Sequence, residues 1–376
     1  MKLITYLILL LFSVGLLESE EKDESINEKG NFEKVWINGV GTFVDQDLIA
    51  AIFKLNRDQN YTHGQGMQLF SSRLTNEIYK NDDDKFIFNL PSKISIKVAG
   101  FTPDELRDTL PVVGDRPYFS ALWLGLDLQR VDQNKFKHTN RSFYFGIMGI
   151  RNVADKIQSS IHNGMNNNNT EEPYDPVGWH NQISNGGEPT AYYQYKITKL
   201  ITTKSLSKES LTGNISRSNR WRNQFTYNLG YSIGYVTNAN IGISGRSGII
   251  DLRNWYSGNS WISSNISSKK NNNNKNRYFN TSRINELYFS YGLNASFTTW
   301  NSALLGQFKE TSYALQYDEL GFLVIDGRAA LEFVLRDINF TFYMGFKTPE
   351  FWTNNSRIHS WGGITLNWQW FNRNAK

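Results

Sequence analysis

The stretch LYFSYGLNASF, Leu287 to Phe297, alternates apolar residues with small or polar ones along its whole length. Its odd positions are all apolar, and its even positions carry Tyr288 followed by serine, glycine and asparagine. Successive side chains of a strand point to opposite faces, so this pattern predicts a strand with one apolar and one polar face. About ten such residues let a tilted strand cross a bilayer. The stretch therefore predicts a membrane-spanning strand whose polar face lines a narrow interior.

Segments of the same kind recur through most of the chain. They cover residues 42–55, 67–71, 86–90, 94–98, 119–128, 142–148, 191–200, 225–235, 236–243, 340–347 and 364–370. We count about eleven to thirteen segments, and an even number near twelve suits a closed barrel. The sequence therefore predicts an all-β fold, an antiparallel transmembrane β-barrel of about twelve strands.

Composition supports an exported barrel. Aromatic residues make up 14% of the 376 residues, whereas the mean hydropathy is only −0.49. Many aromatic residues without long apolar runs are typical of a barrel in a membrane. A secreted β-sandwich or solenoid is the alternative that composition leaves open. The formal net charge of +5 suits an anionic surface partner.

The N-terminus has the pattern of a signal peptide. Lys2 precedes an uncharged, mostly apolar run from Leu3 to Leu17, which is too short for a transmembrane helix of about twenty residues. We expect a signal peptide at 1–19, a charged lead-in at 20–40 and the barrel at 41–376. The chain has no cysteine, which excludes a lipoprotein anchor and disulfides. The expected location is the outer membrane of a Gram-negative bacterium.

The segment from Phe145 to Gln182 is the first place to look for chemistry. After a turn at Gly149, it predicts a short loop helix from Asn152 to about Asn163, because one column is apolar at every fourth residue. This column contains Val153, Ile157 and Ile161. The adjacent column carries Gln158 and His162, which stack one turn apart. His162 is therefore the candidate general base for activating water.

Motif searches exclude several catalytic classes. G-x-S-x-G, H-E-x-x-H and P-loop motifs are absent, and without cysteine no thiolate nucleophile or zinc–thiolate site exists. The other histidines, at positions 63, 138, 180 and 359, are expected in loops or at strand ends. Oxygen ligands that suit calcium come from Asp45, Asp47, Asp58, Glu171, Glu172 and Asp175. Calcium can polarise an ester carbonyl for attack by His-activated water.

Eight further motifs are spread along the chain. They are DQNYTHG (58–64), FTP (101–103), DRPY (115–118), GIMG (146–149), QSSIH (158–162), GWHNQ (178–182), GYVTNANIG (234–242) and WNSALLG (300–306). Together and in this order, they resemble the lipid A 3′-O-deacylase family of outer-membrane barrels. The resemblance implies about a dozen strands and a short extracellular loop helix. It also implies calcium-dependent hydrolysis of the 3′-linked acyloxyacyl ester of lipid A, between the barrel wall and that helix.

The resemblance also implies roles for single residues. His162 would be the base that activates water, with Gln158 as its neighbour and Thr62 facing the site. The family's Glu-Asn-Asp on the first strand aligns with residues 45–47. Asp47 would therefore be a calcium ligand, beside Gln46 in place of the family's asparagine. An acidic residue is expected after the histidine, and three candidates remain open: Glu171, Glu172 and Asp175.

The expected partners are lipid A of lipopolysaccharide and the outer membrane, without a nucleic-acid partner. Lysine and arginine near the outer rim would pair with the phosphates of lipid A. Two other functions stay open. One is an inactive or transport barrel of the same fold, with Gln46 as the first departure from an active site. The other is an outer-membrane phospholipase that acts on glycerolipid.

Overall fold

A computed structural model describes residues 37–46, 63–79, 87–106, 108–132, 134–150, 177–201, 221–250, 286–335 and 338–369. The predicted signal peptide, the predicted helix at 152–163 and the asparagine-rich stretches at 166–169 and 271–274 lie outside the described residues. The first described strand begins at Gly39.

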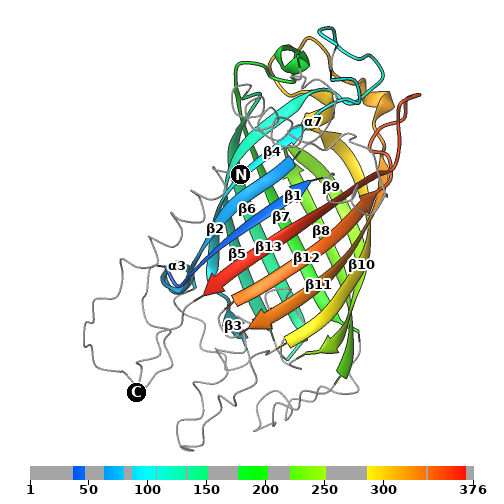
Figure 1. The fold of residues 1–376 in the computed structure, drawn as a ribbon. Coiled ribbons are helices and arrows are strands. Elements are labelled where there is room, and N and C mark those ends of the chain that lie inside the picture. Colours follow the sequence, from blue (N-terminus) through cyan, green and yellow to red (C-terminus); the bar gives the residue numbers. More distant parts are fainter. Residues whose placement is uncertain are drawn as a thin grey trace, which may run out of the picture.

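Twelve antiparallel strands close into a barrel, as the sequence predicted (Figure 1). They are β1 (Gly39–Gln46), β2 (His63–Ser71), β4 (Ser92–Phe101), β5 (Phe119–Asp132), β6 (Lys137–Met148), β7 (Glu188–Leu200), β8 (Trp221–Gly234), β9 (Val236–Ile249), β10 (Glu286–Asn301), β11 (Leu323–Leu335), β12 (Ile338–Lys347) and β13 (His359–Gln369). Each pairs with the next along the chain, and β1 closes the ring by pairing with β13.

The short strand β3 (Ile87–Asn89) extends β4 along the same neighbour. Asn89 pairs with Arg130 of β5, and Lys93 at the start of β4 pairs with Asp127. Pro91 lies between them and has no backbone N–H to donate, which interrupts the ladder. The two segments predicted at 86–90 and 94–98 are therefore one broken strand of the barrel wall.

Strand β11 is missing from the segments named in the sequence. Its lumen face carries Asp326, Arg328 and Glu332, and its outer face carries Gly327 and Ala329 at mid-strand. Charges on one face and small residues on the other weaken the apolar alternation that marks a strand. The predicted total of about twelve still holds, because the broken strand was counted twice.

Outer and inner faces of the wall differ in polarity, as the alternation predicted. On β10, Leu293 is 50% exposed on the outer face, whereas Asn294 points inward and donates a 2.9 Å hydrogen bond to Asp326. On the inner face of the same strand, the Tyr288 hydroxyl donates a 2.8 Å hydrogen bond to Glu332 of β11. The lumen holds a cavity of about 760 Å³ with a mainly polar lining. Hydrogen bonds such as these two lower the cost of burying polar groups in the lumen.

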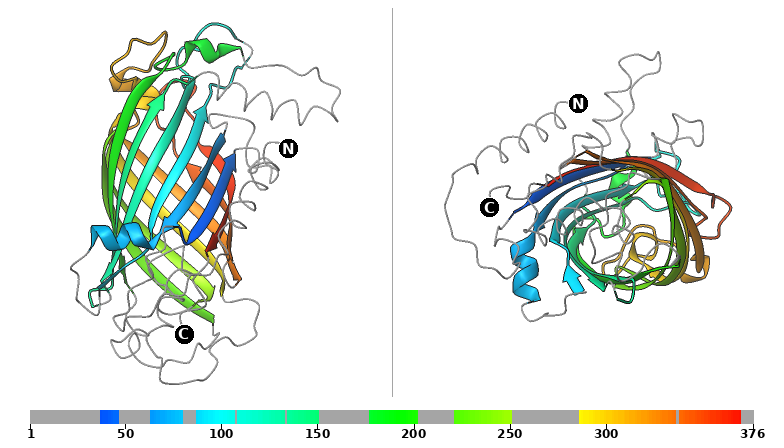
Figure 2. Two further views of the ribbon diagram at one scale, coloured as in Figure 1. Left: turned by 90° about the vertical axis from the view of Figure 1, so that its left-hand side faces the viewer. Right: turned by 90° about the horizontal axis from the view of Figure 1, so that it is seen from below.

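We call the end of the barrel where β1 ends and β2 begins the upper rim. There, aromatic rings fill the lumen: Trp123 lies 5.1 Å from Tyr192 and 4.8 Å from Tyr235, between ring centroids. The short helix α7 (Ser302–Leu305) packs Ala303 against this layer. Seen from below, the orange segment that follows α7 lies within the outline of the barrel (Figure 2). None of the helices in the described ranges is long and apolar enough to span a membrane.

The outer face predicts a measurable cost for a buried charge. Leu293→Arg places a cation against lipid at mid-strand and should lower the free energy of unfolding in phospholipid vesicles by about 2–4 kcal/mol. Urea titration followed by tryptophan fluorescence measures this change. The matched variant Asn294→Arg puts the same charge in the polar lumen beside Asp326. An equal loss in both variants would contradict the assignment of the two faces.

Candidate functional site at the upper rim

Two strand ends flank the predicted calcium ligands. Asp45 of β1 pairs with Gly64 of β2, so Gln46 and His63 lie beside each other at the upper rim. Asp45 points into the lumen and accepts a 2.8 Å hydrogen bond from the Tyr343 hydroxyl. Because side chains alternate along a strand, Gln46 belongs to the outer face of the wall. Gln46 and Asp45 therefore serve different sides of the barrel.

The predicted catalytic segment leaves the wall at a fixed turn after β6. Gly149 has a φ of 79°, and its N–H donates to the Ser120 carbonyl at 2.7 Å. A Cβ at this position would collide with the Ser184 carbonyl, so only glycine fits. Ser184 itself has a positive φ of 54°. The exit path of the chain is therefore set by backbone contacts.

The segment returns to the wall at Gln182, next to its point of departure. Gln182 is fully buried; its Oε1 accepts from the Ser120 hydroxyl at 2.7 Å, and its Nε2 donates to the Gly149 carbonyl at 3.3 Å. One side chain thus ties the incoming chain to the outgoing chain and to β5. The buried amide of Gln182 therefore holds together the two parts of the chain that precede and follow residues 151–176.

A short 3₁₀ helix, η2 (Gly178–Asn181), is held by the loop that precedes β5. The Trp179 ring lies 5.1 Å from the Tyr118 ring, and both side chains are buried. Asn181 donates to the Thr109 carbonyl at 2.7 Å. A Cβ at Gly178 would collide with the Tyr118 ring, so η2 lies directly on it. The 102–118 loop therefore supports the base of the predicted catalytic segment.

An ion pair joins that loop to the opposite side of the rim. Both terminal nitrogens of Arg116 contact Glu350 Oε2, at 3.0 and 2.7 Å, and Lys347 Nζ contacts Oε1 at 3.2 Å. The Arg116 guanidinium also covers the Phe101 ring at 4.3 Å. Charge-assisted bonds between partly buried groups are stronger than exposed ones. The pair connects residues 234 positions apart.

Acid–base properties of the rim follow from these contacts. Burial opposes the charge of Glu350, but Lys347 and Arg116 outweigh it and lower the pKa to about 2. A depressed pKa in the fold contributes stability above the ordinary pKa of 4.5, and this contribution is lost as pH falls through about 2. Burial raises the pKa of Asp115 despite the adjacent Arg116 N–H and charge. The ion pair therefore persists in mild acid.

Of the predicted site residues and candidate calcium ligands, only Asp45 and Gln46 are described. His162, Gln158, Thr62, Asp47 and the alternatives Glu171, Glu172 and Asp175 lie outside the described residues. The remaining histidines lie where expected: His63 and His359 begin strands, His138 is second in β6, and His180 is exposed on η2. Within the described ranges, no three acidic or histidine side chains gather as a metal site. Calcium binding stays a prediction.

A model of the family described as Outer membrane protein LpxR matches residues 9–370. The chain belongs to the LpxR family of outer-membrane proteins. This membership confirms the predicted family and location, and it excludes the soluble sandwich or solenoid. No curated protein sequence matches the chain.

The LpxR fold is also found among solved structures. LpxR from Salmonella typhimurium matches with a TM-score of 0.60 and 14% identity, over 88% of this chain and 100% of that one. At this identity the likeness shows the barrel fold alone. An outer-membrane channel from Pseudomonas putida F1 gives 0.38 and 7% identity, over 92% and 100%. The β-domain of the Bordetella autotransporter BrkA gives 0.35 and 7%, over 89% and 99%.

Sequence reasoning missed the residues that hold the rim together. Gln182 and Arg116 belong to motifs that carried the resemblance, GWHNQ and DRPY, but no role was predicted for either. Glu350 has no motif around it. Its function depends on a partner far away in the chain, which no local pattern reveals.

Removal of the Arg116 side chain should loosen the rim. Arg116→Ala leaves the Glu350 carboxylate with Lys347 alone, at an expected cost of about 3 kcal/mol. Backbone amides of residues 102–118 and 348–358 should then exchange hydrogen about a hundredfold faster at pH 7, measured by mass spectrometry. Lys309→Ala, which removes an exposed cation bonded to the Asn185 carbonyl, is the control. Unchanged exchange in Arg116→Ala would contradict this role.

Proposed function

We propose that this protein is a lipid A 3′-O-deacylase that hydrolyses the 3′-linked acyloxyacyl ester in the outer leaflet. Membership of the LpxR family is the observation that carries the proposal. The frame at the upper rim supports it, because the segment containing Gln158 and His162 leaves and returns through one hydrogen-bonded base at Gly149 and Gln182. Fixing both ends of this segment helps to position His162 accurately for its role as the general base.

The proposed reaction is attack of water on the ester carbonyl. His162 takes a proton from the attacking water, and the bond between the acyl carbon and the sugar 3′-oxygen breaks. The same proton then passes to the leaving oxygen, so a free fatty acid and a 3′-hydroxyl result. Gln158, one helical turn before His162, orients the water or the ester by hydrogen bonding.

Calcium is the proposed cofactor, held by Asp47 and Gln46. Both side chains offer oxygen atoms, which calcium prefers, and Gln46 ends β1 on the outer face of the wall. The bound ion would supply positive charge to polarise the ester carbonyl. Thr62, which immediately precedes β2, is proposed to face the same site.

Three strand steps, roughly 14 Å, separate β2 from β6 at this rim. A twelve-residue helix is roughly 18 Å long, enough to cross that distance.

Two other functions are weighed against this proposal. Transport through the lumen is disfavoured by the buried aromatic layer around Trp123 and Tyr235 and by the helix α7 beneath the rim. An outer-membrane phospholipase would use the same water-activating residues on a glycerolipid ester. The nature of the released acyl chain distinguishes it from the deacylase.

Substitution of the proposed base should abolish deacylation. In a Gram-negative host, the wild-type chain should remove an acyloxyacyl mass from lipid A, and His162→Ala should reduce this at least about a hundredfold. Mass spectrometry of lipid A measures the loss. His180→Ala removes an exposed histidine of η2 and should leave activity unchanged. Unmodified lipid A with an inserted wild-type barrel would rule out the deacylase for that lipid A.

Two neighbouring aspartates separate metal binding from lumen structure. Asp47→Asn should weaken the response to calcium and raise the calcium concentration for half-maximal activity by about tenfold or more. Asp45→Asn changes a lumen residue bonded to Tyr343 and should keep the wild-type calcium response. Activity is assayed at buffered calcium concentrations. If a calcium chelator leaves the activity of the wild type unchanged, the proposed role of calcium is wrong.

A further inference from the structure

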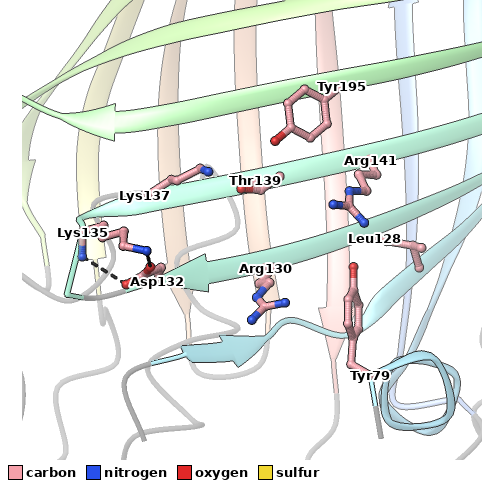
Figure 3. Close-up of a pocket in the computed structure, with 9 residues that line it drawn as sticks. All are labelled: Tyr79, Leu128, Arg130, Asp132, Lys135, Lys137, Thr139, Arg141 and Tyr195. Atoms are coloured by element: carbon pink, nitrogen blue, oxygen red, sulfur yellow. Dashed lines mark hydrogen bonds and ion pairs between the residues drawn. The ribbon is translucent and has the colours of Figure 1, made fainter. Parts of the chain in front are cut away.

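A basic pocket lies at the end of the barrel opposite the proposed site. We call this end, where β5 ends and β6 begins, the lower rim. A pocket of about 240 Å³ there is lined by four cations: Arg130, Lys135, Lys137 and Arg141 (Figure 3). Asp132 is the one carboxylate in its lining, so three positive charges are in excess. An anionic ligand is therefore electrostatically favoured.

The pocket opens on the outer face of the wall. Arg141 shares a strand face with Phe143 and Phe145, both exposed on the outside. Arg141 pairs with Leu128, and Arg130 pairs with Thr139, so the two arginines are diagonal neighbours on one face. Diagonal positions are roughly 7–8 Å apart, within reach of one phosphate group.

Aromatic rings fix the depth of the pocket in the membrane. Tyr195 lines it and pairs with Arg141, and its ring lies 5.6 Å from the ring of Tyr231 on β8. Tyr79, directly after the helix α3 (Ser72–Ile78), closes the other side with its hydroxyl toward the strands (Figure 3). Tyrosines gather at the level of lipid headgroups. The arginines therefore lie where lipid phosphates lie.

The lower rim faces the leaflet of glycerophospholipids. The connections between β5 and β6 and between β11 and β12 are short here, as periplasmic turns are in barrels, whereas those between β7 and β8 and between β9 and β10 are longer. β1 also begins and β13 ends at this rim. In the proposed orientation the upper rim is extracellular, which places the pocket at the inner leaflet.

We propose that this pocket binds the phosphate of an anionic glycerophospholipid from the inner leaflet. The planar guanidinium groups of Arg130 and Arg141 donate paired hydrogen bonds to the phosphate oxygens. Lys137 adds a positive charge, and Asp132, which pairs with it across the two strands, lies at the lower edge of the pocket. The acyl chains of the lipid extend toward the upper rim over Leu122 and Leu124, which are exposed on the outer face of β5.

Native mass spectrometry of the full barrel in a neutral detergent tests the proposal. Phosphatidylglycerol is titrated against the wild type and against Arg130→Gln/Arg141→Gln. Loss of two charge-assisted contacts should raise the dissociation constant of the most tightly bound lipid by about tenfold or more. The control Lys196→Gln/Arg246→Gln removes the same charge from the lumen wall and should bind as the wild type does. Equal affinity in wild type and the arginine variant overturns the proposal.

Two further arms identify the ligand. Zwitterionic phosphatidylcholine should bind at least about tenfold more weakly than phosphatidylglycerol; equal binding overturns the anionic choice. Inorganic phosphate at the same concentration as the lipid should not displace it. If phosphate does displace the lipid, the proposed lipid ligand is overturned and the pocket binds a free anion instead. If the double variant fails to fold, the single variant Arg141→Gln, at an exposed position, decides instead. Wild-type affinity in this variant also overturns the proposal.

Discussion

The pairing of β1 with β13 is the constraint on which the rest of this protein depends. In the hydrocarbon region no water is available for backbone groups, so every strand edge must be paired. The register runs from Gly39 opposite Gln369 to Gln46 opposite Gly362. At this seam Gly41 leaves space for the bonded side chains of Gln68 and Asn367, with which a Cβ would collide. A missing side chain thus allows the ring to close.

Closure creates two environments from one alternating pattern. Outside, leucine, isoleucine and aromatic side chains meet lipid. Inside, charged residues are kept from lipid and partner one another, as Lys93 and Asp127 do at 2.8 Å. A lone buried charge would be costly, but a bonded network is tolerated. The aromatic layer near the upper rim then blocks the lumen, which favours chemistry on the wall and its loops.

The rim shows how distant segments build a rigid base. Ser120 and Gln182 lie 62 positions apart, and Arg116 and Glu350 lie 234 apart, yet each pair is in contact. These contacts tie three loops to one strand end. A frame of this kind restricts where the proposed catalytic segment can lie, because both of its ends are anchored to β5 and its neighbours. Positioning of this sort is the main contribution of a scaffold to hydrolysis.

The sequence by itself determined the strand pattern, the two faces and the approximate strand number, because alternation is a local property with a period of two. It missed β11, where charges such as Asp326 and Glu332 face the lumen and small residues face lipid. It also identified the family through ordered motifs, and through that resemblance it predicted roles for His162, Gln158, Thr62, Asp47 and Gln46. Of these, the described structure contains Gln46 alone.

Tertiary structure alone decided the closing seam, the Arg116–Glu350 pair, the Gln182 anchor and the basic pocket around Arg130 and Arg141. Each depends on which residues face each other across strands or loops. Register between strands is set by the closed ring as a whole, since a shift of one residue would reverse every side chain. No local window of sequence contains that information.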